Sequence, residues 1–172
     1  FDISGLTANT KYYYQTSTDG GFTSALDFFY TAKTDASTKM AFLHYGDCGY
    51  NNTVQNDIAA LMVGDSTEFG IVAGDVDQGT GDNYDEVFFG PYTDLMKNAC
   101  QYTCIGNHDT YADNAATYLD AFYLPTNNPT QSERYYSFTW GNGKFICLDA
   151  NIDYSIGSDQ HNWMLEELQC ND

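Results

Sequence analysis

Three apolar runs, each closed by a glycine and a polar side chain, constrain the fold of this chain more than any other feature. They end at Gly46-Asp47, Gly74-Asp75 and Gly106-Asn107. Asp75 follows Asp47 by 28 positions and Asn107 follows Asp75 by 32, about the length of one strand-helix-strand unit. The spacing therefore predicts an α/β domain that starts β-α-β-α-β, with parallel strands.

The segments between and after these runs predict further elements. The first predicted helix presents one apolar face, made of Val54, Ile58, Leu61 and Met62. A second amphipathic stretch, from Val87 to Met96, is interrupted at Gly90-Pro91. Residues 135–140 and 144–148 flank a Gly-Asn-Gly turn and predict a β-hairpin, and Ser158 is the expected N-cap of a helix that ends at Leu168.

The chain divides into three parts by composition. Residues 1–34 alternate short apolar segments with turn residues, which predicts three strands at the end of a β-sandwich. Residues 35–39 form a polar linker, and residues 40–172 form the α/β part. Because residue 1 is not Met and residue 172 closely follows a predicted helix, we expect both ends to be cut from a longer protein.

The polar residues after the three runs predict a metal site. In open α/β sheets, ligands bind beyond the carboxyl ends of the strands, so Asp47, Asp75 and Asn107 should converge on one edge. One Gly-Asp pair alone is an ordinary turn, whereas three in phase favour a shared site. Carboxylate and amide oxygens suit hard or borderline divalent ions.

Charge and cysteine content exclude some classes of protein. The chain has 24 acidic and 6 basic residues, and its net charge of −18 repels nucleic acid. No apolar run approaches the roughly 18 residues that span a bilayer. Among the five cysteines, Cys100 and Cys104 lie roughly 13 Å apart along one strand, too far for a disulfide. Cys104 and Cys147 lie in apolar runs, which predicts two small buried hydrophobic residues.

The ordered motifs resemble a known family. Residues 46–49, 74–77 and 106–109 (GDCG, GDVD and GNHD) are similar to the motifs of calcineurin-like metallophosphoesterases, and the first motif resembles the purple acid phosphatase branch. Residues 135–149 and 160–164 are similar to the same branch, and residues 6–14 resemble the end of a fibronectin type III-like domain. The implied fold is a metallophosphoesterase-type β-sandwich flanked by helices, preceded by the last strands of that β domain and truncated at its C-terminal end.

The resemblance also implies a function. The expected activity is hydrolysis of phosphate esters at a dinuclear metal centre, with a metal-bound hydroxide as the nucleophile. Asp47 would bind the first ion, Asp75 would bridge both, and Asn107 would bind the second, the ions being Fe, Zn, Mn or Mg. His108 would protonate the leaving group, oriented by Asp109. The substrate would be a small-molecule or protein phosphoester, without nucleic acid, and the location secreted or extracytoplasmic.

Two departures from the family keep an alternative open. Gln78 stands where purple acid phosphatases place a tyrosine ligand, and the later histidine motifs have no counterpart before Asp172. His44 and His161 are expected to be structural. The alternative is therefore a non-catalytic secreted binding or structural module on the same fold. A calcium loop starting at Asp75 is a poor match, because Thr80 replaces its required glycine.

Overall fold

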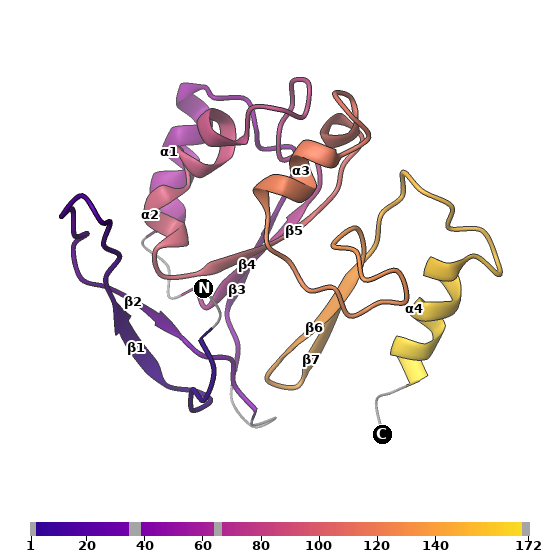
Figure 1. The fold of residues 1–172 in the computed structure, drawn as a ribbon, viewed down its shortest axis with the longest axis horizontal. Helices are drawn as coiled ribbons and strands as arrows, with labels where there is room; N and C mark the ends of the chain where they lie inside the picture. The colour runs from indigo at the N-terminus through magenta and orange to yellow at the C-terminus, as the bar shows by residue number, and fades with distance from the viewer. Residues whose placement is uncertain (1–2, 35–38, 64–66, 170–172) are drawn as a thin grey trace.

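A computed structural model describes residues 3–34, 39–63 and 67–169 of the chain (Figure 1). The strands are β1 (Lys11–Tyr14), β2 (Asp27–Tyr30), β3 (Phe42–Tyr45), β4 (Phe69–Ala73), β5 (Cys100–Cys104), β6 (Tyr136–Trp140) and β7 (Gly143–Cys147). The helices are α1 (Thr53–Met62), α2 (Thr93–Met96), α3 (Ala116–Ala121) and α4 (Asp159–Gln169), with a π-helical turn η1 (Asp85–Phe89) and a 3-10 turn η2 (His108–Thr110).

A parallel three-stranded sheet in the order β3-β4-β5 organises the molecule. Helix α1 connects β3 to β4, and η1 with α2 connects β4 to β5. The predicted β-α-β-α-β order and the break at Gly90-Pro91 are thus confirmed, since η1 ends before Gly90 and α2 begins at Thr93. The structure is a mixed α/β fold.

The two faces of this sheet are covered differently. On the helix side, the ring of Tyr45 lies 5.3 Å from that of Tyr92, and the hydroxyl of Tyr118 donates to the carbonyl of Thr103. On the other side, the antiparallel hairpin β6–β7 packs its aromatic side chains against the sheet. There Tyr102 and Phe138 stack with ring centroids 3.6 Å apart. The predicted hairpin is confirmed, and it forms a layer of its own.

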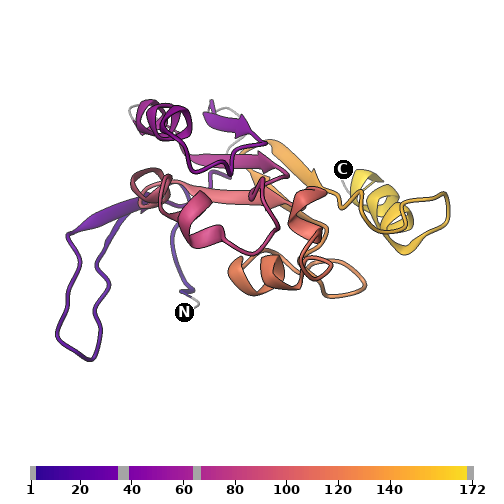
Figure 2. The ribbon, with the colours of Figure 1, turned by 90° about the horizontal axis from the view of Figure 1, so that it is seen from above.

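The N-terminal arm and α4 lie at opposite ends of the molecule (Figures 1 and 2). Strands β1 and β2 pair antiparallel, and the side chain of Asn98 donates to Phe28 O at 2.8 Å, which ties the arm to the α/β part. Residues 3–6 form no strand, so the first of the three expected N-terminal strands is wrong there, while residues 1–2 lie outside the described residues. Ser158 caps α4 as predicted, because its Oγ accepts the N–H of His161.

Helix α1 corrects a prediction. Of its expected apolar face, Val54, Ile58 and Leu61 are 64%, 50% and 77% exposed, and Met62 is buried. The inward face carries Gln55 instead. This side chain accepts the N–H of Asn51 at 2.6 Å and donates to the carbonyl of Val87, so buried polar contacts fix the rotation of the helix. The apolar stripe consequently borders a groove of about 630 Å³ between α1 and β3.

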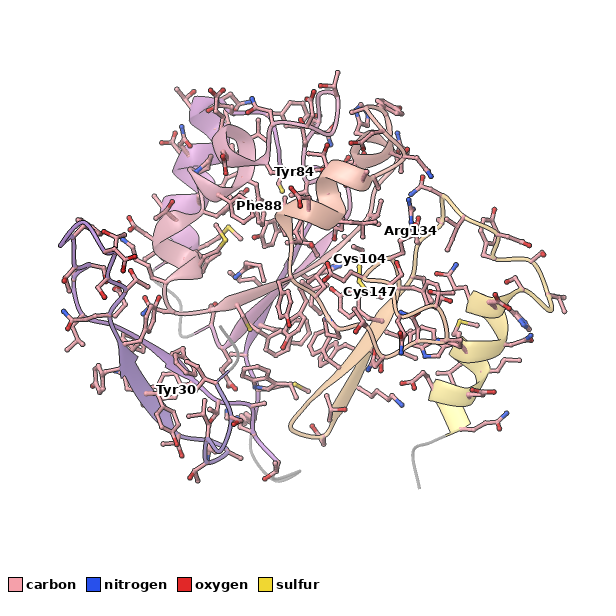
Figure 3. All side chains as sticks on the ribbon, in the orientation of Figure 1. Tyr30, Tyr84, Phe88, Cys104, Arg134 and Cys147 are labelled. Atoms are coloured by element: carbon pink, nitrogen blue, oxygen red, sulfur yellow. A yellow bond between two sulfur atoms is a disulfide. The ribbon has the colours of Figure 1, made fainter. Side chains whose placement is uncertain are left out.

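A disulfide corrects a second prediction. Cys104 at the end of β5 is bonded to Cys147 at the end of β7, with Cα atoms 5.9 Å apart (Figure 3). The two residues are 43 positions apart in sequence and meet because the hairpin packs across the sheet. They are therefore not separate buried hydrophobic residues. Cys100 is free, which agrees with its predicted distance from Cys104. Cys170 lies outside the described residues.

Within the described ranges, no helix combines the length and the apolar character needed to cross a membrane.

Candidate functional site

The loops after β3, β4 and β5 meet at the carboxyl edge of the sheet. The N–H of Asp47 donates to the carbonyl of Gly74 at 3.2 Å, and the N–H of Cys48 donates to the carbonyl of Asp75 at 3.3 Å. The N–H of His108 donates to Asp75 Oδ1 at 2.9 Å. Direct hydrogen bonds therefore join the three segments that carry the predicted site residues.

The backbone at this edge is strained and tightly packed. Asp47 and Asp75 have φ values of 50° and 49°, in the left-handed region that non-glycine residues rarely adopt. Such a conformation costs about 1 kcal/mol or more and persists where the surroundings enforce it, often at functional sites. A Cβ on Gly106 would lie 2.1 Å from both the backbone nitrogen and the Oδ1 of Asp75, so only glycine allows this approach. The Gly-polar pairs are thus geometric requirements of the edge.

Each predicted ligand keeps one oxygen available. Asp47 accepts the side-chain amide of Gln78 through Oδ1 at 2.9 Å, and Asp75 uses its own Oδ1 for His108. The amide nitrogen of Asn107 donates to the hydroxyl of Tyr111 at 2.8 Å, which leaves its Oδ1 as the acceptor. Among the described residues, the second carboxylate oxygens and this amide oxygen have no hydrogen-bond partner. These three oxygens lie on the loops that meet at the edge.

The chemistry of these oxygens can be compared with that of a metal shell. In residues 3–34, 39–63 and 67–169, no group of three or more His, Cys, Asp or Glu side chains is arranged to hold a metal ion. The edge supplies two carboxylates and one amide, a donor chemistry that suits hard or borderline cations. Three oxygens are fewer than two ions require, so further ligands would have to come from water, substrate or other protein groups.

His108 faces the loop that follows β4. Its Nδ1 lies 3.3 Å from the carbonyl oxygen of Gly79, and its ring centroid lies 4.6 Å from that of Tyr111. When Nδ1 donates to Gly79, Nε2 is left without a hydrogen-bond partner in the described part of the chain. The ring is half-buried, so this nitrogen can serve a bound molecule.

Asp109 has a different role from the predicted one. Its side chain is fully buried and accepts the N–H groups of Val76, Asp77 and Gly106 at 3.2, 3.1 and 2.8 Å. The Tyr84 hydroxyl, labelled in Figure 3, donates to it at 3.1 Å. The expectation that it orients the ring of His108 is wrong, because in η2 the two side chains point to different surroundings. Burial raises the pKa of the Asp109 carboxyl, against the lowering effect of these hydrogen bonds. Asp109 ties the β4 and β5 loops together.

Three further polar residues at this edge were not predicted as site residues. Gln78 contacts Asp47, and the buried Asp77 organises the loop that carries Gln78. Asp149, at the end of the hairpin, is fully buried against Arg134, whose Nη1 donates to it at 2.7 Å. Two of them had a sequence signal: Asp149 follows a strand as Asp47 and Asp75 do, and Gln78 stands at the position of the family's tyrosine ligand.

Among the described residues, the openings at this edge contain no lysine or arginine, and His44 is the histidine that lines one of them. The groove beside Asp47 and a second cleft of about 370 Å³ beside Gln78 and Tyr50 are lined, within the described residues, without any lysine or arginine. Arg134 is engaged with Asp149, and Lys33, Lys97 and Lys144 are paired with other acids. An anion entering this edge would therefore meet carboxylates without a protein cation to offset them.

Comparison with known proteins gives a structural likeness. No family model matches the sequence, and no curated protein matches it. Among solved structures, the chain is similar to purple acid phosphatase PPD1 from yellow lupin (Lupinus luteus) seeds, with a TM-score of 0.81 and 17% identity. The match covers 99% of this chain and 35% of that protein, so the chain spans about a third of its neighbour. At this identity the likeness supports a metallophosphoesterase-like fold.

Proposed function

We propose that this chain carries part of the active site of a metal-dependent phosphoester hydrolase of the purple acid phosphatase type. The carrying observation is that Asp47, Asp75 and Asn107 follow three adjacent parallel strands, and that each leaves an oxygen without a hydrogen-bond partner among the described residues. A metallophosphoesterase-like fold supports this proposal, because it gives the edge a precedent for phosphate chemistry.

The proposed cofactors are two ions among Fe, Zn, Mn and Mg. Asp47 and Asn107 would each hold one ion, and Asp75 would bridge them. When bound, a metal pair lowers the pKa of a water and clamps phosphate oxygens. Such cations would offset the carboxylates of Asp47 and Asp75, which alone would repel a phosphate.

The protein's own contribution would be positioning and proton transfer. Gln78 orients Asp47 by donating to one of its oxygens, and the N–H of His108 does the same for Asp75. With Nδ1 directed to Gly79, the Nε2 of His108 would carry the proton that the departing alkoxide or phenoxide needs. The proposed substrate is a small-molecule or protein phosphoester.

The location of the protein is proposed to be extracytoplasmic. The disulfide between Cys104 and Cys147 favours an oxidising compartment, because cytosolic thiols are kept reduced. The net charge of −18 disfavours nucleic acid as a partner.

The test is metal binding combined with hydrolysis of an aryl phosphate by the full chain. We expect stoichiometric uptake of Zn²⁺ or Mn²⁺, and loss of at least one ion in Asp75→Asn. Full occupancy of two sites in that variant would contradict the bridging role. Among the described residues, the proposed metal ligands include two carboxylates, those of Asp47 and Asp75. The second candidate function is therefore that of a non-catalytic module on the same fold. Failure to bind any of the four metals would favour that module.

A further inference from the structure

The loop after β4 is folded around one buried carboxylate. Asp77 is 2% exposed, and its Oδ1 accepts the N–H of Gly79 at 2.6 Å. Its Oδ2 accepts three more backbone N–H groups, at 3.1 to 3.2 Å, from Gly81, Asp82 and Asn83. A carboxylate that accepts four backbone donors fixes the path of the whole segment, because each donor left without an acceptor would cost about 1–3 kcal/mol.

This loop contacts two different residues of the candidate site. The side chain of Gln78 donates to Asp47 Oδ1, and its backbone N–H donates to Gly49 O at 3.1 Å. The next residue, Gly79, presents its carbonyl oxygen 3.3 Å from the Nδ1 of His108. The same loop therefore contacts Asp47, an expected metal ligand, through the side chain of Gln78. It contacts His108, the expected proton donor, through the carbonyl of Gly79.

The loop also passes closely under His108. Gly81 has a φ of 78°, and a Cβ there would lie 2.7 Å from the carbonyl oxygen of His108. A side chain at position 81 would therefore clash with the backbone of His108 and Asp109. Two features therefore hold the segment in place. The carboxylate of Asp77 accepts its backbone N–H groups, and Gly81 packs closely against the backbone of His108 in the β5 loop.

We propose that Asp77 is a positioning residue that sets the orientation of Asp47 through Gln78 and that of His108 through Gly79. The chemical consequence rests on the proposed function, whereas the orientation of His108 can be observed without metal or substrate. Residues that orient metal ligands typically change metal affinity or activity about 10- to 100-fold when removed. We expect Asp77→Ala to fall within that range.

The chain offers a matched control. Asp113 is also an aspartate whose carboxylate accepts a backbone N–H, that of Thr117 at 3.0 Å, and it lies at an exposed position after β5. It contacts neither Asp47 nor His108. Asp113→Ala therefore makes the same substitution and removes a carboxylate that binds one backbone N–H, at an exposed position away from the site. Asp77→Asn keeps one acceptor oxygen and should give an intermediate effect.

The experiment measures two quantities on the full chain and its variants. Calorimetric titration with Zn²⁺ gives metal affinity, and long-range proton–nitrogen NMR spectra of the metal-free chain give the ring signals of all three histidines. His44 on β3 and His161 on α4 serve as internal references. We expect Asp77→Ala to move the His108 signal alone and to weaken Zn²⁺ binding about 10- to 100-fold, with Asp113→Ala changing neither.

The outcomes separate this proposal from the proposed function. An unmoved His108 signal in Asp77→Ala overturns the positioning role, as does an equal shift in Asp113→Ala. If the unaltered chain binds no Zn²⁺, the metal site fails, and the His108 signal still decides the role of Asp77. If Asp77→Ala does not fold, Asp77→Asn decides the His108 contact. Gln78→Leu then decides the Asp47 contact, which is refuted if Zn²⁺ affinity is unchanged.

Discussion

The face of the β3-β4-β5 sheet that packs against the hairpin and the carboxyl edge of the same sheet are stabilised by different interactions. Against the hairpin, Phe69 is completely buried and its ring contacts five other aromatic rings, those of Phe42, Tyr102, Phe138, Trp140 and Phe145. At the carboxyl edge, buried Asp77 and Asp109 accept backbone N–H groups from the site loops. The hairpin layer relies on apolar packing, whereas the edge relies on directional hydrogen bonds.

This difference predicts that the hairpin layer mainly determines the free energy of unfolding, and that the carboxyl edge mainly determines the positions of the site residues. Apolar packing contributes in proportion to buried area and tolerates small displacements. Hydrogen bonds from fixed backbone groups specify positions within a few tenths of an ångström, as a metal site requires. Changes in the hairpin layer should therefore lower the free energy of unfolding, and changes at the edge should mainly lower metal affinity.

The largest expected effect on stability comes from Phe69→Ala. Removing a fully buried phenylalanine lowers the free energy of unfolding by about 3–5 kcal/mol, because a cavity replaces its contacts. Under conditions where the variant stays folded, Zn²⁺ affinity should remain within about twofold of the unaltered chain. Denaturant titration and calorimetry measure the two quantities. Ile156→Ala, at a 91% exposed position, is the control and should change neither. A large loss of Zn²⁺ affinity in Phe69→Ala would show that the hairpin layer also determines the geometry of the metal site.

The disulfide should have the second largest effect. Replacing both Cys104 and Cys147 by alanine removes a covalent link between β5 and the hairpin, at an expected loss of about 2–4 kcal/mol in the free energy of unfolding. Cys104 lies only three positions before Asn107. This change therefore tests whether a change in the hairpin layer alters the geometry of the carboxyl edge. The ring signal of His108 should stay in place. Replacing the free Cys100 by alanine, which breaks no disulfide, controls for loss of sulfur.

Gly106→Ala should show the opposite pattern. Its new Cβ meets the backbone nitrogen and carboxylate of Asp75, so the β4 and β5 loops must separate. We expect a loss of about 1–3 kcal/mol in the free energy of unfolding and a fall in Zn²⁺ affinity of at least about tenfold. Gly157→Ala is the comparison, because that glycine has φ 93° but open space around it. Equal affinity in the two variants would show that loop contact at Gly106 does not shape the site.

The same contrast explains which parts of the structure were predictable. The three parallel strands, the hairpin and the Ser158 cap follow from local patterns of apolar residues, glycine and capping residues. The convergence of the three loops followed from topology alone, since carboxyl ends of parallel strands share one edge.

Three of the failures involve contacts between segments distant in sequence. The face of α1 was wrong because Gln55 finds its partner at Val87, 32 positions away. The disulfide was missed because Cys147 reaches Cys104 only after the hairpin packs on the sheet. The family resemblance assigned Asp109 to orient His108, whereas its partners lie in the β4 loop and at Gly106 and Tyr84. Local periodicity carries no information about such partners.

The smallest effect should come from Glu68→Gln, at the joint between the hairpin and the sheet. Burial opposes the charge on Glu68, but hydrogen bonds from Lys33, Trp140 and Ala41 outweigh it and lower the pKa of its carboxyl from the ordinary 4.5. Since the folded chain favours the carboxylate, its contribution to stability is present at neutral pH. That contribution is lost as the pH falls through the ordinary pKa and then the lowered folded one.

Glu68→Gln should therefore lower the free energy of unfolding by about 1 kcal/mol at neutral pH, with a smaller difference in acid. Denaturant titrations of both proteins at neutral pH and near pH 3 measure this change. A difference that grows in acid would show that the ion pair with Lys33 is not what stabilises the joint. Zn²⁺ affinity should not respond to the substitution, because Glu68 precedes β4 and lies at the strand end opposite the site.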